Sequence, residues 1–291
     1  MKRKSKRSLA LLLTGALLAG FLPTGTGAKS RAAEQPTLQN PRILKTTQEV
    51  APGSAGKKEL KNPTTENGIT TWDCIWFGNY WQEDTNGDGK ADKNDEKTPI
   101  KWRVLSVKGD DVFLLADKNL DAQSYNDTEM SVTWETCTMR SWLNGYGAET
   151  NACGKDYRTE NFMDYAFTAE EKAAVKTTTL ANNDNPEYET AGGNNTSDQV
   201  YLLSIDEVKN LLYGFSEGDT DVDYCKRLSV NTAYTAAGGE IQSENMVSAG
   251  EEDAWWLRSS GYDSTTASYI YYDGSIDKHG DKGNFHYATR P

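Results

Sequence analysis

The chain has 291 residues and carries 43 acidic against 31 basic side chains, which gives a net charge of −12. An acidic surface repels nucleic acid and anionic lipid, so we exclude nucleic-acid binding and favour a cation or a neutral polar ligand such as a sugar. Four cysteines in a chain of this length are too few for a disulfide scaffold.

Residues 1–33 have the order of a secretory signal peptide. Basic residues come first, an uncharged apolar stretch follows from Leu9 to Leu22, and small residues come next. The apolar stretch is shorter than the roughly 20 residues that a membrane-spanning helix requires, although an uncleaved membrane anchor is the alternative. We expect an exported protein, secreted or held at the cell surface, with no stable membrane insertion after cleavage. Cleavage removes seven basic residues and no acidic ones, which lowers the net charge from −12 to −19.

Residues 34–68 predict a flexible linker, because they contain four prolines, many polar residues and no aromatic residue. All eight tryptophans and all fifteen tyrosines lie at or beyond Trp72. We therefore expect one folded domain over residues 69–291, which is long enough to bury a sizeable core.

The beginning of this domain predicts three strands. Residues 71–77 and 100–107 alternate between apolar and polar side chains, which is typical of half-buried strands. A third apolar run, 111–116, follows the turn signal Gly109-Asp110. The second and third strands should therefore form a hairpin.

Three short helices are predicted next. Thr133 can cap a helix that runs to Asn144 and stops at Gly145. Capping boxes begin the other two, one over residues 168–175 and one from Ser204 to about Gly214. A compact apolar strand at 200–203 is expected just before the last helix.

The C-terminal part predicts strands again, separated by turns and long loops. The hairpin signal Asp273-Gly274 lies between two of these strands, and the polar loops 182–197 and 236–252 are of a length that is often functional. The segments expected as strands are 254–258, 267–272, 275–277 and 285–290. The whole pattern predicts an α+β fold, mainly antiparallel sheet with a few short helices.

A calcium-loop pattern spans residues 84–95. Side-chain oxygens at positions 1, 3, 5, 9 and 12, a backbone carbonyl at position 7 and a glycine at position 6 match that pattern. The expected ligands are Asp84, Asn86, Asp88, Lys90 through its carbonyl, Asp92 and Asp95. Position 12 is Asp rather than Glu and no exit helix follows, so a solvated acidic loop is the alternative. We predict a structural calcium ion with a dissociation constant on the order of micromolar to millimolar.

No catalytic constellation is found in the sequence. Both histidines, His279 and His286, lie among the last predicted strands, with no nucleophile elbow, zinc-protease motif or phosphate-binding glycine loop nearby. We expect no enzyme activity and no catalytic residue, and an exported hydrolase with acidic catalytic residues is a less favoured alternative. The spacing of Cys74, Cys137, Cys153 and Cys225 fits no zinc motif and leaves disulfides and free thiols open.

Residues 259–287 are dense in Tyr, Ser, Asp, Asn, Gly and His. Antibody paratopes share this composition, because Tyr gives a large contact area at low entropy cost and small polar residues give adaptable hydrogen bonds. An ordinary polar hairpin with an aromatic face is the alternative. The expected ligand-binding residues are Tyr262, Asp263, Tyr269, Tyr271, Tyr272, Asp273, Asp277, His279, Asn284, His286 and Tyr287.

Eight short motifs occur in a fixed order between residue 99 and the last residue. They are Pro99–Leu105, Val132–Asn144, Ala166–Glu171, Gly192-Gly193, Val200–Glu207, Trp255–Ser259, Asp273–Ser275 and Arg290-Pro291. With these motifs, residues 70–291 resemble domain-of-unknown-function family 6273, uncharacterised exported and surface proteins of anaerobic Gram-positive gut bacteria.

The resemblance implies a fold distantly similar to the C-type-lectin-like and sulfatase-modifying-factor folds, and no known reaction. Formylglycine-generating activity uses a cysteine pair late in the fold, whereas the last cysteine here is Cys225. In similar proteins the chain continues past Arg290-Pro291 into a few apolar residues, which implies a clipped last strand. We expect an exported C-type-lectin-like module that binds an extracellular protein or glycan. A structural surface protein without such a ligand is the alternative.

Overall fold

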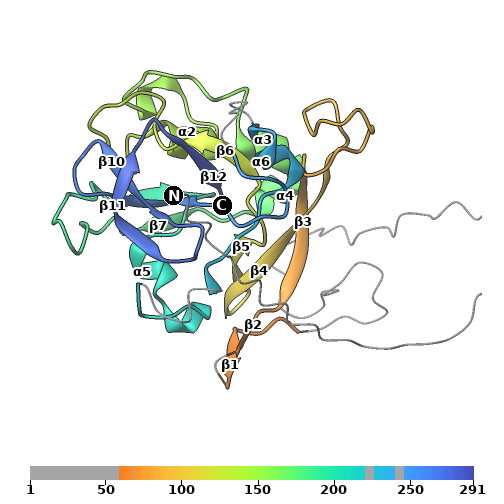
Figure 1. Cartoon of the computed structure of the whole chain (residues 1–291), viewed down its shortest axis with the longest axis horizontal. Coiled ribbons are helices and arrows are strands. Elements are labelled where there is room, and N and C mark those ends of the chain that lie inside the picture. Colours follow the sequence, from red (N-terminus) through yellow and green to blue (C-terminus); the bar gives the residue numbers. More distant parts are fainter. Residues whose placement is uncertain (1–58, 68, 220–225, 240–245) are drawn as a thin grey trace, which may run out of the picture. The chain divides into compact units, whose positions relative to one another are not determined.

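The computed structural model describes residues 59–67, 69–219, 226–239 and 246–291 (Figure 1). The predicted signal peptide and most of the predicted linker therefore lie outside the described residues. Within the described ranges, no helix is both long enough and apolar enough to cross a membrane.

Strands and short helices alternate along the described chain. In order they are β1 (Thr64–Glu66), β2 (Ile69–Thr71), β3 (Cys74–Tyr80), β4 (Thr98–Lys108), β5 (Asp111–Ala116), β6 (Asp121–Ser124), α2 (Thr138–Asn144), η2 (Ala148–Thr150), α3 (Phe162–Ala166), α4 (Ala169–Ala174), β7 (Thr178–Leu180), β8 (Thr196–Asp198), α5 (Ile205–Val208), η3 (Leu211–Tyr213), α6 (Ala233–Ala236), β9 (Trp255–Ser260), β10 (Thr266–Ile270), β11 (Ile276–Lys282) and β12 (His286–Thr289). The predicted α+β class, mostly antiparallel sheet with a few short helices, is confirmed.

Two larger sheets organise these elements. One has the strand order β3-β4-β5, and the other has the order β11-β10-β9-β12-β6. Both sheets are antiparallel except where β12 runs parallel to β9. Two-stranded ribbons join β1 with β2 and β7 with β8. The second sheet therefore joins β6 to four strands that lie more than 130 residues later in the chain.

The N-terminal hairpin follows its sequence pattern closely. β5 has the predicted bounds, and the turn before it places Gly109 at a φ of 61°. β3 begins later than expected, at Cys74, and continues to Tyr80 through an irregularity at Gly78. Gly78 has a φ of 69°, and a side chain there would meet the ring of Phe167 at 2.6 Å. This close contact explains why glycine interrupts the alternation.

Part of the predicted linker takes part in the fold. Residues 64–66 pair with β2, and Leu60 is only 3 % exposed and belongs to the core. The backbone N–H of Lys61 donates to Asp73 at 2.9 Å. The described fold thus begins within the predicted linker, at residue 59.

Two of the three predicted helices begin at their predicted caps. Capping boxes begin α4 at Thr168 and α5 at Ser204, as predicted. The predicted start of α2 is wrong, because residues 133–137 form turns and the thiol of Cys137 caps the helix instead. The predicted end near Gly214 is also wrong for α5. That helix stops at Val208, and the separate turn η3 reaches Gly214.

The segment 200–203 was predicted as a strand and does not form one. Leu202 and Leu203 are buried, and the carbonyl of Leu203 accepts a hydrogen bond from the N–H of Arg258 at 2.9 Å. The apolar composition of this segment reflects its burial. A buried loop and a buried strand can have the same apolar composition, so the sequence did not separate the two.

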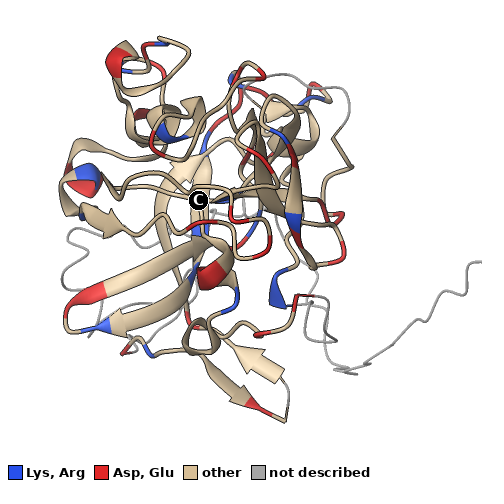
Figure 2. Ribbon diagram, turned by 90° about the vertical axis from the view of Figure 1, so that its left-hand side faces the viewer, with Lys and Arg blue, Asp and Glu red and all other residues tan. Residues whose placement is uncertain are grey.

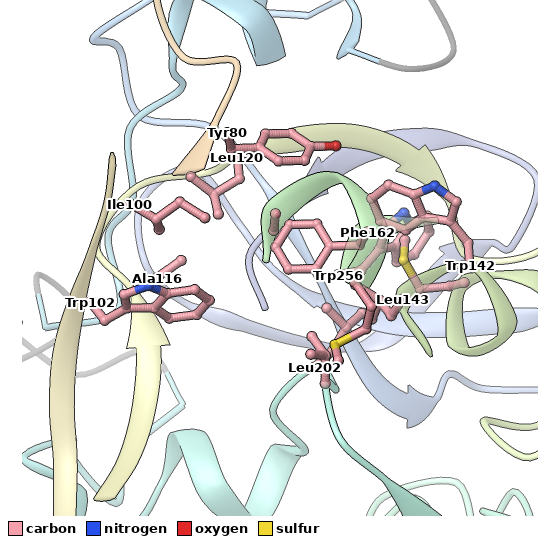
Figure 3. Close-up of a cluster of buried hydrophobic side chains, with 14 of the residues drawn as sticks. Tyr80, Ile100, Trp102, Ala116, Leu120, Trp142, Leu143, Phe162, Leu202 and Trp256 are labelled. Atoms are coloured by element: carbon pink, nitrogen blue, oxygen red, sulfur yellow. The ribbon is translucent and has the colours of Figure 1, made fainter. Parts of the chain in front are cut away.

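The core lies on both faces of the five-stranded sheet. Trp256 belongs to the larger cluster and Trp255 to the smaller one, because successive strand residues point to opposite faces. Figure 3 shows Trp256 of the larger cluster with Trp142 and Phe162 from the helical region, and Trp102 from β4 beyond them. Trp102 of β4 and both tryptophans of β9 are thus buried.

Candidate functional site

The predicted calcium loop joins β3 to β4 and projects from them on the side away from β10 and β11 (Figure 1). Asp84 accepts hydrogen bonds from the backbone N–H groups of Gly87 (2.6 Å) and Gly89 (2.8 Å). Asp95, only 7 % exposed, accepts from the N–H groups of Thr85 (2.7 Å) and Asp92 (2.8 Å). Bonds from backbone N–H groups, with that of Asp92 first, hold the pKa of Asp95 below its usual value.

The remaining predicted side-chain ligands also engage the loop backbone. Asn86, Asp88 and Asp92 each accept a hydrogen bond from the N–H two residues further on, at 2.7 to 2.9 Å. Among the described residues, no three His, Cys, Asp or Glu side chains lie close enough together to hold a metal ion. Calcium binding by this loop therefore stays a prediction.

The predicted ligand residues of the C-terminal strands differ in exposure. Tyr269 is only 6 % exposed and belongs to the core. The half-buried ones are Asp263, Asp277, Asn284 and Tyr287, and the exposed ones are Tyr262, Tyr271, Tyr272, Asp273, His279 and His286. The structure does not bring them into one patch. It forms an inner and an outer aromatic group, and it places the exposed rings of Tyr271 and Tyr272 against each other, with 4.2 Å between centroids. His286 lies on β12, paired across the sheet with Ser124.

The inner group consists of tyrosines that are tied to carboxylates. The hydroxyl of Tyr269 donates to Asp277 (3.0 Å) and that of Tyr287 donates to Asp281 (2.9 Å). Their ring centroids are 4.8 Å apart, and Trp256 lies 4.8 Å from Tyr287. Burial, supported by the nearby carboxylates, raises the pKa of both phenols. These tyrosines are therefore neutral hydrogen-bond donors.

The outer group is an exposed cluster of three rings, Tyr188, Tyr262 and His279, which we term the aromatic surface. Tyr262 stacks on His279 with 4.2 Å between centroids and 18° between planes. Tyr188 stands nearly perpendicular to His279, at 88° and 5.7 Å. Tyr188 and Tyr262 are 39 % and 45 % exposed. The apolar ring faces of this cluster are thus accessible to a ligand.

Tyr188, which lies in the long loop 182–197, was not among the predicted ligand residues. Asn185, 1 % exposed, anchors this loop by donating to the carbonyls of Ser260 and Lys278, both at 2.8 Å. Its side-chain oxygen accepts from the N–H of Tyr188 at 3.3 Å. The loop is therefore fixed to β9 and β11, and its unusual length was the only signal for its role.

Three cysteines lie among the described residues, and they are free thiols. Burial raises the pKa of Cys137 to about 12 and also raises the pKa of Cys74. Cys225 lies outside the described residues. The two thiols with raised pKa are poor nucleophiles, and Cys137 has a structural role as the cap of α2.

A comparison with known protein families identifies the family of this chain. A family model described as "Domain of unknown function (DUF6273)" matches residues 109–291, which is more than half of the chain. No curated protein and no solved structure matches the chain. The matched range begins at the turn between β4 and β5 and includes both aromatic groups. The chain therefore belongs to the DUF6273 family, whose domain has no known function.

Proposed function

We propose that this domain is an exported ligand-binding module whose glycan or protein ligand binds at the aromatic surface. The observation that carries the proposal is the exposed stack of Tyr262 on His279 with Tyr188 set against it. Aromatic rings supply contact area at low entropy cost and can pack against the apolar face of a sugar ring. Export is supported by the signal-peptide pattern of residues 1–33.

Polar groups beside the rings favour a ligand rich in hydroxyl groups. The side chain of Glu187, which precedes Tyr188 in the chain, is 50 % exposed and forms an ion pair with Lys278 at 3.0 Å. Carboxylates accept hydrogen bonds from hydroxyls strongly. Figure 2 shows further acidic residues in many loops of the domain, and such a surface disfavours anionic ligands. A neutral glycan is therefore the first probe to use.

We propose binding rather than catalysis, because the rings lie on an exposed surface. An exported hydrolase with acidic catalytic residues would place two carboxylates with separated pKa values around one reacting bond. The carboxylates of the inner group, Asp277 and Asp281, instead accept hydrogen bonds from Tyr269 and Tyr287. The loop 182–197, anchored so that it presents the exposed Tyr188, favours a binding role over a purely structural one.

We also propose that the loop 84–95 binds calcium and that the domain has a C-type-lectin-like arrangement. The loop supplies carboxylate and amide oxygens at the required spacing, and hard oxygen ligands suit calcium. Calcium would link the two ends of the loop and stiffen the connection from β3 to β4. Calorimetry of the mature chain with calcium chloride tests this, and no heat at millimolar calcium would contradict it.

A glycan and surface-protein array tests the proposed function, with residues 34–291 applied with and without calcium. We expect a bound ligand whose affinity falls about tenfold or more in Tyr188→Ala and in Tyr262→Ala. Leu212→Ala is the matched control, because Leu212 is 78 % exposed and lies outside the aromatic surface. No binding to any glycan or protein on the array would speak against a binding module.

A further inference from the structure

The chain contains three Asn-Gly pairs, which are Asn67-Gly68, Asn86-Gly87 and Asn144-Gly145. In such a pair the backbone nitrogen of the glycine can attack the side-chain amide of the asparagine, because a glycine has no side chain that hinders the approach. Gly68 lies outside the described residues. The other two pairs have different surroundings, which the structure describes in full.

Asn144, the last residue of α2, is half-buried and held by its neighbours. Its side-chain nitrogen donates to the carbonyls of Arg140 (3.0 Å) and Val200 (2.8 Å), and its side-chain oxygen accepts from the N–H of Val200 (3.0 Å). The N–H of Gly145 donates to the carbonyl of Ser141. An attack by the nitrogen of Gly145 would therefore have to break several hydrogen bonds first.

Asn86 and Gly87 are exposed, in the loop between β3 and β4. The side-chain oxygen of Asn86 accepts a hydrogen bond from the N–H of Asp88 at 2.8 Å. This bond closes a turn that includes the peptide nitrogen of Gly87, so it holds the Asn86 amide beside that nitrogen. The same N–H would stabilise the negative charge that develops on the Asn86 oxygen during an attack.

A proton acceptor lies next to the attacking nitrogen. The carboxylate of Asp84 accepts a hydrogen bond from the N–H of Gly87 at 2.6 Å. A carboxylate at this distance can take up the proton while the nitrogen forms its new bond. The nucleophile, the electrophile and the base thus lie within four consecutive residues, with solvent around them.

We propose that Asn86 is a site of spontaneous deamidation, with the nitrogen of Gly87 as nucleophile and Asp84 as the proton acceptor. The nitrogen of Gly87 forms a bond to Cγ of Asn86 and closes a succinimide ring. The proton of Gly87 passes by way of Asp84 to the side-chain nitrogen of Asn86, whose bond to Cγ breaks, and ammonia leaves. Water then opens the ring at either carbonyl and gives aspartate or isoaspartate at position 86.

Deamidation would change the ligand set of the predicted calcium loop. Aspartate at position 86 adds a negative charge at the third position of the loop, where the calcium pattern accepts Asn or Asp. Isoaspartate lengthens the backbone there and alters the spacing of the ligands. All reacting groups belong to the chain and to water, so the reaction does not depend on calcium binding or on the aromatic surface.

Timed incubation of residues 34–291 tests the proposal, at neutral pH with a calcium chelator and in water enriched in heavy oxygen. Peptide mass spectrometry locates the heavy oxygen that each deamidation incorporates. We expect position 86 to react at least about tenfold faster than position 144 in the folded chain. In urea the two positions should react at rates within about threefold of each other, because the difference arises from the fold.

Two variants test the role of the carboxylate. Asp84→Asn should slow the reaction at position 86 about threefold or more. Asp92→Asn is the matched control, because it removes the same charge from the same loop without touching Gly87, and it should leave the rate unchanged. Circular dichroism and slow reaction at Asn144 confirm that both variants are folded.

Four outcomes would overturn the proposal. Two concern the parent chain, namely no heavy oxygen at position 86 and equal rates at positions 86 and 144 in the folded state. A tenfold difference that persists in urea would assign the reaction to local sequence rather than to the fold. Equal rates in Asp84→Asn and Asp92→Asn would remove Asp84 as the proton acceptor.

Discussion

The ring of Tyr262 lies nearly parallel to the imidazole of His279, at 18° and 4.2 Å between centroids. The N–H of Tyr262 donates to the carbonyl of His279 at 2.7 Å, so the backbone holds the two residues side by side. Because this arrangement exists before a ligand arrives, less side-chain freedom is lost on binding. The pair is thus a preorganised part of the aromatic surface.

The first prediction separates the ring of Tyr262 from its hydroxyl. Tyr262→Phe should retain affinity for the array-identified ligand within about threefold, whereas Tyr262→Ala should lose about tenfold, because stacking requires the ring. Isothermal titration calorimetry measures both, and the melting midpoint should stay unchanged because Tyr262 is exposed. Equal losses in the two variants would instead assign recognition to the hydroxyl.

The second prediction concerns Asn185, which anchors the loop that carries Tyr188. Asn185→Ala should lower the free energy of unfolding by about 1–3 kcal/mol, because the carbonyl of Lys278 loses the Asn185 donor and that of Ser260 is left with the hydroxyl of Ser268. Ligand affinity should fall as well, since Tyr188 is no longer held in place. Asn183→Ala is the control in urea unfolding, because that side chain is exposed and donates to Asp206 at 2.7 Å. Similar effects of the two variants would refute the anchoring role.

The third prediction is a pH dependence from Asp95. Its pKa is lower in the folded state than the roughly 3.9 of an unfolded chain, so its carboxylate stabilises the fold above that pH. The contribution is lost as the pH falls through the folded pKa. In calcium-free buffer, Asp95→Asn should melt below the parent at pH 7, and the difference should shrink as the pH falls below about 4. A difference that stays constant with pH would contradict this.

The elements that were predicted correctly from the sequence depend on residues close together in the chain. The hairpin of β4 and β5 needs only alternating side chains and a glycine turn, and each capping box needs only four consecutive residues. β6 was missed because Asp121–Ser124 has no strand pattern. It forms through pairing with β12, more than 150 residues later. Such pairing cannot be read from composition.

The candidate site was predicted only in part, for a similar reason. Composition identified Tyr262 and His279, but it could not tell that Tyr269 faces inward. Alternation assigns residues to the two faces of a strand, whereas the face that becomes buried depends on what packs against it. Tyr188 was missed because the bonds that bring its loop to β9 and β11 connect residues 75 or more positions apart.

The last prediction concerns Arg290, which is fully buried beside the final residue of the chain. Its guanidinium donates to the carbonyls of Ala116 (2.8 Å) and Arg227 (3.2 Å) and lies 5.0 Å from the ring centre of Trp255. Burial holds its pKa well below the usual value.

Arg290→Ala would remove the guanidinium donor from the carbonyl of Ala116 and would leave the carbonyl of Arg227 with the indole N–H of Trp255, at 3.1 Å. It would also remove the contact with the ring. It should therefore lower the free energy of unfolding by about 3–5 kcal/mol. Arg290→Lys should recover part of this loss, because an ammonium group keeps the charge but cannot reach all the acceptors. Arg158→Ala is the control, since Arg158 pairs with Asp156 at the surface and should leave the urea midpoint unchanged. If Arg290→Ala and Arg158→Ala unfold at the same urea concentration, the buried guanidinium does not stabilise the fold as predicted.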